Sequence, residues 1–134
     1  MGLWRYFPKK PDLEKLSPPA IRAFFKIAGL WRLSTDEQIA LLGRPARSTF
    51  FKWKKDQTGK LTRDQLDRVS YLLGIFKALE VLYPDEPSAN AWIKQPNTAP
   101  LFGGQSVFAF ILSTGIAGLF QVRRYLDAQH DGWA

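Results

Sequence analysis

The spacing of apolar residues constrains the fold of this chain more than any other feature. Between Arg63 and Tyr83, apolar side chains follow an i, i+3, i+7 rhythm through Leu66, Val69 and Leu73, which is typical of one face of a helix. The same spacing recurs in an earlier segment, at Ile21, Phe24, Ala28 and Trp31. No stretch of useful length alternates apolar and polar residues, as a half-buried strand would. The chain is therefore predicted to be all-α.

Capping and helix-breaking residues predict where the helices begin and end. Ser17 before Pro18 predicts the start of the first helix, which would run to about Leu33. Ser34 and Glu37 have the spacing of a capping box. Further helices are predicted over about 36–42, 46–55, 63–83, 86–94 and 107–112, and a last helix is predicted to run to about 128. Their expected N-caps include Thr62, Ser106, and Ser113 or Thr114.

Positive charge is concentrated in the first half of the chain. Of the 134 residues, 1–60 hold thirteen Lys and Arg against five Asp and Glu, whereas 61–134 hold six against seven. Only the first half therefore suits a polyanionic partner, although a basic protein without a nucleic-acid partner is an open alternative. Cysteine is absent, which excludes disulfides and thiolate metal sites and fits a reducing compartment. No run of about 18 apolar residues predicts a membrane span, so we expect a cytoplasmic protein.

Two short helices joined by a tight turn predict a helix-turn-helix over residues 36–55. Ala40 would lie where the helices cross, Gly43 would form the turn, and Phe50 and Trp53 would anchor the second helix inward. The candidate DNA-binding residues are Arg44, Arg47, Ser48, Thr49, Lys52, Lys54 and Lys55. Arg47, Ser48 and Lys52 could reach base edges. Lys54, Lys55 and Lys60 are better placed for phosphates. The alternative is a helical hairpin with a solvated basic face.

The string GRPARSTFFKW, residues 43–53, resembles the pattern of Xre-type repressors, in which a turn glycine precedes a Ser/Thr-rich helix start and a tryptophan. It departs from that pattern in two ways. Gly43 follows Ala40 by three residues where four is usual, and Pro45 stiffens the turn.

No arrangement of reactive side chains predicts catalysis. The only histidine is His130, and neither an HExxH, a GxSxG nor a glycine-rich phosphate loop occurs. Asp64 and Asp67 lie beside Arg63 and Arg68, which predicts surface ion pairs. We therefore expect a protein that is not an enzyme and that needs no cofactor or metal.

The last third of the chain carries a more specific resemblance. Trp92-Ile93, Pro96-Asn97, the string LFGGQS at 101–106 and the string VRRYLDAQHDGWA at 122–134 together resemble the toxin-binding domain of Xre/MbcA/ParS-type antitoxins. The resemblance covers about residues 62–134, and with the helix-turn-helix it covers nearly the whole chain. Val107 and the pair His130-Asp131 depart from many relatives. We accordingly expect a DNA-binding-like module over 1–60 and a toxin-binding and dimerisation domain over 61–134.

The resemblance implies an antitoxin of a RES–Xre toxin–antitoxin system. Its partners would be operator DNA and a cognate RES-domain toxin that degrades NAD or transfers its ADP-ribose, and the antitoxin would cover the active-site cleft of that toxin. It would also repress its own operon, and we expect a homodimer within a larger toxin–antitoxin complex. A stand-alone transcription repressor is the alternative function.

The resemblance also points to the residues that would contact the toxin. They are Asn97, Phe102, Gly103, Gly104, Arg123, Arg124, Trp133 and Ala134. Trp133 would be a rigid anchor, and the two arginines would meet carboxylates. The alternatives are core packing for Phe102, a solvated helix end for Arg123 and Arg124, and packing onto its own helix for Trp133.

Overall fold

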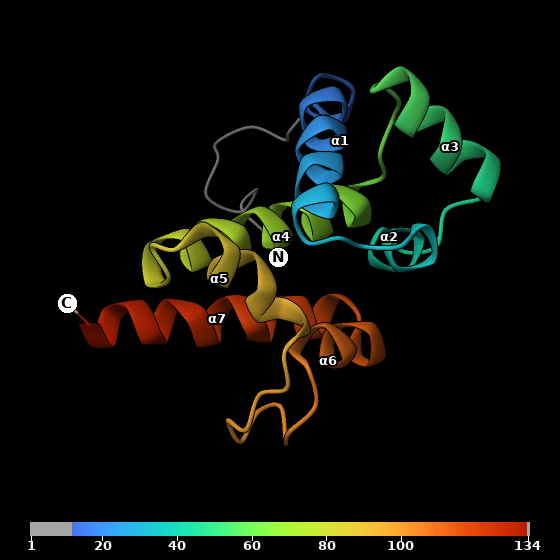
Figure 1. Ribbon diagram of the computed structural model, residues 1–134. Helices are drawn as coiled ribbons and strands as arrows, with labels where there is room; N and C mark the ends of the chain where they lie inside the picture. Colours follow the sequence, from blue (N-terminus) through green and yellow to red (C-terminus); the bar gives the residue numbers. More distant parts are fainter. Residues whose placement is uncertain (1–11, 134) are drawn as a thin grey trace. The chain divides into compact units, whose positions relative to one another are not determined.

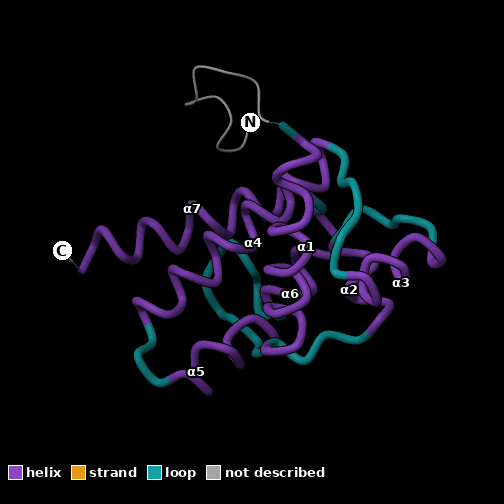
Figure 2. The backbone as a smooth tube through the Cα atoms, turned by 90° about the horizontal axis from the view of Figure 1, so that it is seen from above, coloured by secondary structure: helices purple, strands orange, loops and turns teal. Residues whose placement is uncertain are grey.

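The computed structural model describes residues 12–133, and for residues 132 and 133 it describes the backbone alone. Its helices are α1 (Leu13–Leu30), α2 (Thr35–Leu41), α3 (Arg47–Asp56), α4 (Arg63–Leu82), α5 (Glu86–Ala91), the short 3-10 helix η2 (Trp92–Lys94), α6 (Val107–Thr114) and α7 (Ile116–Trp133) (Figure 1). Figure 2 draws the described residues as helix and loop throughout. The predicted all-α fold is confirmed.

The chain divides into two compact units, and the border lies between Leu73 and Gly74. This differs from the sequence-based division between residues 60 and 61, which lies ahead of α4. The physical reason is that α4 is one uninterrupted helix with buried residues on both sides of the border, from Leu66 to Leu79. No change in composition marks the border, because it falls inside a continuous apolar stripe.

The first unit buries a core of aromatic and aliphatic side chains. α1 packs against α3, and the Phe25 ring meets the Phe50 ring edge-on with centroids 5.5 Å apart. Phe24, Phe50 and Leu61 are almost completely buried. Burial of each such side chain contributes about 1.5–3 kcal/mol, so this core fixes α1, α3 and the segment that precedes α4.

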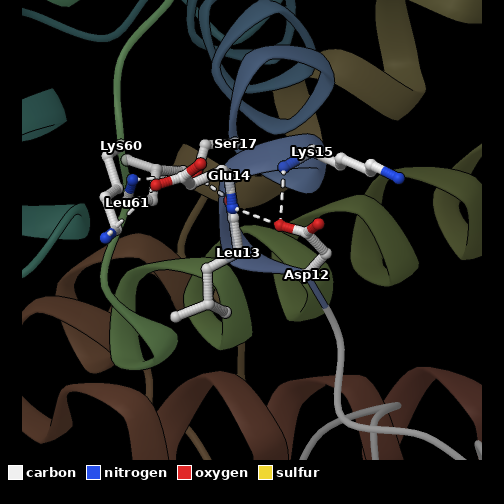
Figure 3. Close-up of polar contacts among 7 residues, drawn as sticks. All are labelled: Asp12, Leu13, Glu14, Lys15, Ser17, Lys60 and Leu61. Atoms are coloured by element: carbon white, nitrogen blue, oxygen red, sulfur yellow. Dashed lines mark hydrogen bonds and ion pairs between the residues drawn. The ribbon is translucent and has the colours of Figure 1, made fainter.

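The start of α1 corrects the prediction that Ser17 is its N-cap. The helix begins one turn earlier, where the Asp12 carboxylate accepts from the backbone N–H groups of Glu14 and Lys15 at 3.1 and 3.2 Å (Figure 3). Ser17 is fully buried inside the helix. Its hydroxyl donates to the Leu13 carbonyl and accepts from the Leu61 N–H at 2.9 Å. Ser17 thus joins α1 to the segment before α4.

Two predicted helix starts are confirmed as capping boxes. Ser34 Oγ accepts from the Glu37 N–H at 3.1 Å, and Glu37 accepts from the Ser34 N–H at 2.8 Å, at the start of α2. Thr62 and Gln65 exchange the same pair of bonds at the start of α4, at 3.1 and 2.9 Å. Each box satisfies N–H groups that a helix end otherwise leaves unpaired.

The second unit is built around α6 and α7, which pack against each other. Ile93, Val107, Leu119 and Val122 have no exposed surface. The predicted N-cap of α6 is confirmed, because Ser106 Oγ accepts from the Ala109 N–H at 3.0 Å. η2 also packs against α6, so the segment that leads into the following loop is fixed to this core.

The structure at the junction between α6 and α7 corrects a second predicted N-cap, that of α7. Ser113 and Thr114 do not cap α7, because their hydroxyls donate back to the Phe110 carbonyl within α6. Gly115 separates the two helices with φ +67°, and its carbonyl accepts from the Leu119 N–H at 3.1 Å. α7 also continues to Trp133, beyond the predicted end near residue 128.

Among the described helices, none combines the length and the apolar character that crossing a membrane requires.

Candidate functional site

The turn between α2 and α3 is held by backbone bonds and by the start of α4. Gly43 has φ +79°, and its N–H donates to the Ala40 carbonyl at 3.2 Å. A Cβ at Gly43 would lie 3.2 Å from Arg68 Nε and 3.3 Å from Asp64 Oδ2. These two side chains form the ion pair predicted from the sequence, at 2.8 Å. Glycine is therefore required here both by the backbone conformation and by the packing of α4 against the turn.

The inner face of α3 is anchored as the sequence predicts. Phe50 has no exposed surface, and Trp53 is also buried. Gly59, with φ +153°, lies directly against the Trp53 indole, and a Cβ there would overlap the ring atoms Cδ1 and Nε1. These contacts fix the rotation of α3 about its axis, and hence which side chains face outward.

The outer face of α3 and its preceding turn are polar and basic. All seven predicted DNA-binding residues are exposed, namely Arg44, Arg47, Ser48, Thr49, Lys52, Lys54 and Lys55. Phe51 is an exposed aromatic residue among them, at 44% exposure. The arrangement presents donors for base edges and cations for phosphates from one helix and its turn.

The structure brings to this surface one residue that the sequence analysis missed. Asp36, on α2, accepts from Arg47 NH1 at 2.9 Å. The Arg47 guanidinium carbon also lies 5.7 Å from the centroid of the Phe51 ring. An exposed ion pair of this kind contributes only about 0.2–1 kcal/mol to stability. Asp36 and Arg47 are eleven residues apart and belong to different helices, so no periodic pattern in the sequence links them.

The loop between η2 and α6 is tightly closed and projects from the second unit (Figure 1, orange). Pro96 and Ser106 form an antiparallel bridge at its base. The Asn97 N–H donates to the Gln105 carbonyl at 3.1 Å, and the Gly104 N–H donates to the Asn97 carbonyl at 2.8 Å. Asn97 Oδ1 accepts from the Ala99 N–H at 2.9 Å. Asn97 therefore shapes the loop with its backbone and its side chain together.

The glycines of this loop leave its tip uncovered. Gly103 and Gly104 are exposed, with φ +61° and +93°. No atom lies within 4 Å of the place where either would carry a Cβ. The tip thus presents bare backbone in a conformation that glycine adopts without strain.

Phe102 lies beneath this loop and not on its surface. It is 2% exposed, and its ring meets those of Phe110 and Tyr125 edge-on, with centroids 5.4 and 5.3 Å apart. The Trp92 ring also meets the Phe102 ring edge-on, with centroids 6.3 Å apart. This burial differs from the direct toxin contact predicted for Phe102, because its own chain covers the ring. Phe102 is therefore a core residue, which is the alternative that the sequence analysis gives for it.

The two candidate arginines of α7 have different surroundings. Arg123 is half-buried and bonds Asp127 through Nε at 3.2 Å. Its guanidinium lies against Gly74, where any Cβ would overlap it. Arg124 is exposed, with its guanidinium carbon 5.8 Å from the Phe120 ring centroid. Of the remaining candidates, the Trp133 side chain and the whole of Ala134 lie outside the described residues.

The described residues thus form a helix-turn-helix protein of two compact units: the first has an exposed basic second helix, and the second has an exposed glycine loop. Residues 15–74 match the antitoxin Xre-like helix-turn-helix domain, and residues 78–132 match the antitoxin Xre/MbcA/ParS C-terminal toxin-binding domain. The chain belongs to the Xre/MbcA/ParS-type antitoxins, as its sequence motifs predict. It is also similar to a curated protein of Sinorhizobium fredii, the uncharacterized protein y4oB. The two are 48% identical over 115 residues, which cover 86% of this chain and 87% of the relative.

Proposed function

We propose that this antitoxin neutralises a RES-domain toxin that consumes NAD, by covering the active-site cleft of the toxin. We further propose that it represses its own operon through α3, and that it acts in the cytoplasm as a homodimer within a toxin–antitoxin complex. The observation that carries the proposal is the match of residues 78–132 to a toxin-binding domain, in a unit that presents an exposed loop and an exposed arginine.

The toxin-facing surface in this proposal combines Gly103, Gly104 and Arg124. The bare backbone of the two glycines allows a partner to approach closely. The Arg124 guanidinium offers a planar set of donors to the carboxylates of a cleft. Asn97 and Phe102 act indirectly, because Asn97 shapes the loop through its hydrogen bonds and the Phe102 ring is buried beneath it. In this proposal Trp133 and Ala134, at positions 133 and 134 of the sequence, serve as the anchor.

Arg123 takes a supporting part in this proposal. Its bond to Asp127 and its contact with Gly74 occupy the guanidinium within the unit. An interface arginine that is already immobilised loses less side-chain entropy on binding. We therefore assign the direct ionic contact to Arg124 and a flanking contact to Arg123.

The neutralisation arm is tested by co-expressing the chain with a RES-domain protein encoded beside it. We expect growth arrest to be relieved, cellular NAD to be restored, and the two proteins to elute together on size exclusion. Deleting residues 132–134, or the substitution Arg124→Ala, should weaken all three effects. Failure of the unaltered chain to rescue growth or to form a complex would overturn the toxin assignment.

The repression arm is tested with a reporter placed behind the promoter of the same operon. The double charge reversal Arg47→Glu with Lys52→Glu should abolish repression while leaving neutralisation intact, so it is also the matched control for the tail deletion. A chain that represses but neutralises nothing would instead be a stand-alone repressor.

A further inference from the structure

We propose that Asp36 and Phe51 are positioning residues, which hold the Arg47 guanidinium ready to contact a guanine edge in the major groove. The inference rests on the proposed DNA binding, and it adds to it a base preference and two residues that need not touch DNA.

Arg47 is held from two elements. It is the first residue of α3. Its NH1 atom donates to Asp36 Oδ1 at 2.9 Å, and Asp36 belongs to the first turn of α2. Its guanidinium carbon lies 5.7 Å from the centroid of Phe51, one turn further along α3. The Phe51 ring meets the buried Phe50 ring edge-on, with centroids 5.4 Å apart, so the platform under Arg47 is itself fixed.

Stability does not account for this arrangement. The Arg47 and Asp36 side chains are 62% and 86% exposed, and exposed ion pairs add little to folding. A carboxylate on a DNA-facing surface also repels the phosphates that the neighbouring lysines attract. Its positive effect is orientation: a carboxylate on one side and an aromatic ring on another restrict a planar guanidinium to few rotamers.

The chemistry of a restricted guanidinium at this position points to guanine. In helix-turn-helix proteins the N-terminal residues of the second helix contact base edges. Two parallel N–H donors match the O6 and N7 acceptors of guanine. A phosphate, in contrast, can also be bound by a lysine, which acts as a point charge. The substitution Arg47→Lys keeps the positive charge but changes the shape of the donor group. It should therefore weaken a contact to a guanine edge and leave a contact to a phosphate largely intact.

The test begins by selecting bound duplexes from a pool with a randomised central segment, using the full-length chain. We expect a preferred site that contains a guanine in each half. Affinity is then measured for that site and for a shuffled duplex of the same length, with the wild type, Arg47→Lys, Asp36→Asn, Phe51→Leu and Phe51→Tyr. Glu80→Gln, which removes an exposed carboxylate from α4, is the matched charge control.

The preference for the selected site over the shuffled duplex should fall roughly ten- to hundredfold in Arg47→Lys, with an unchanged dependence on salt. In Asp36→Asn we expect the two affinities to respond differently. Binding to the selected site should weaken, whereas binding to the shuffled duplex should stay equal or become tighter. Phe51→Leu should lower the preference, and Phe51→Tyr should restore it. Glu80→Gln should leave it unchanged.

An equal change on both duplexes in Asp36→Asn, or a full preference in Arg47→Lys, would overturn the positioning role while leaving DNA binding intact. A wild type that binds every duplex alike would overturn the guanine preference, and one that binds no duplex would overturn the repression arm of the proposed function. Unchanged melting temperatures and intact toxin neutralisation distinguish these results from misfolding.

Discussion

At the scale of single residues, two glycines of the first unit have opposite surroundings. Gly59 has a positive φ and lies against the buried Trp53 ring, whereas Gly29 lies in α1 with nothing within 4 Å of its missing side chain. Gly59→Ala should lower the free energy of unfolding by about 1–3 kcal/mol, because the ring must shift. Gly29→Ala should raise it by about 0.5–1 kcal/mol, because alanine favours a helix. Urea unfolding of both variants measures the contrast, and a loss in both would contradict it.

Asp85 makes a pH-dependent contribution at the start of α5. Bonds from the Ser88 hydroxyl, and then from the Ser88 backbone N–H, lower the pKa of Asp85 below its ordinary value of 3.8. Because the folded pKa is the lower one, the stabilisation is complete above the ordinary value and is lost as the pH falls through the lowered pKa. Asp85→Asn keeps a capping side chain but should remove this part of the pH dependence. Melting temperatures between about pH 2 and pH 6 test it, and parallel profiles would disprove it.

At the scale of secondary-structure elements, α1 depends on a hydroxyl in its second turn. Pro18 and Pro19 have no N–H, so the helix lacks two of its backbone bonds there. Next to these prolines, Ser17 donates to the Leu13 carbonyl and accepts from the buried Leu61 N–H, which ties this part of α1 to the segment before α4. Ser17→Ala should lower the free energy of unfolding by about 1–3 kcal/mol, because that N–H is left without a partner.

The control for this change is Ser113→Ala, at an exposed hydroxyl of α6. We expect an effect of about 0.5 kcal/mol or less. Urea unfolding and hydrogen exchange at the Leu61 amide report on both variants. Equal effects of the two substitutions would show that the Ser17 bond has no special role.

The helices that the sequence predicted well are those whose signals are local. Ser34 with Glu37, Thr62, and Ser106 act on residues within three positions of themselves. Local signals misplace the N-cap of α1 at Ser17, because the N–H that bonds its hydroxyl oxygen belongs to Leu61, far away in the sequence. They misplace the N-cap of α7 at Ser113 or Thr114, because a hydroxyl in a helix can equally bond the carbonyl three or four residues back.

In the candidate site, too, features that depend on local signals could be predicted, and features that depend on distant residues could not. Exposure of Arg47 and its basic neighbours follows from the helical period and the inward anchors Phe50 and Trp53. The pairing of Arg47 with Asp36, the burial of Phe102 and the contact of Arg123 with Gly74 depend on tertiary packing. No local pattern encodes such contacts.

At the scale of the whole molecule, the uneven charge predicts two binding activities with different salt dependence. The positive excess lies within residues 1–60, and residues 61–134 are nearly balanced. If four cationic side chains neutralise phosphates, DNA affinity should fall about a hundredfold between 50 and 200 mM salt. Toxin binding should change far less, because the proposed toxin surface includes one direct ionic contact, from Arg124, beside the bare backbone of Gly103 and Gly104. Titrations of both complexes at several salt concentrations test this, and equal slopes would contradict it.

The position of the border inside α4 has a consequence for how the protein can be degraded. A protease needs an extended stretch of backbone to enter its active site, and exposed loops supply it. The border at Leu73 and Gly74 lies in an unbroken helix, and the nearest non-helical segments are 57–62 and 83–85. Cleavage within 57–62 separates the first unit from its part of α4, residues 63–73. Cleavage within 83–85 separates the second unit from its part of α4, residues 74–82. A single cleavage at either segment would therefore damage one unit, so proteolysis would not release the two units from each other with both intact.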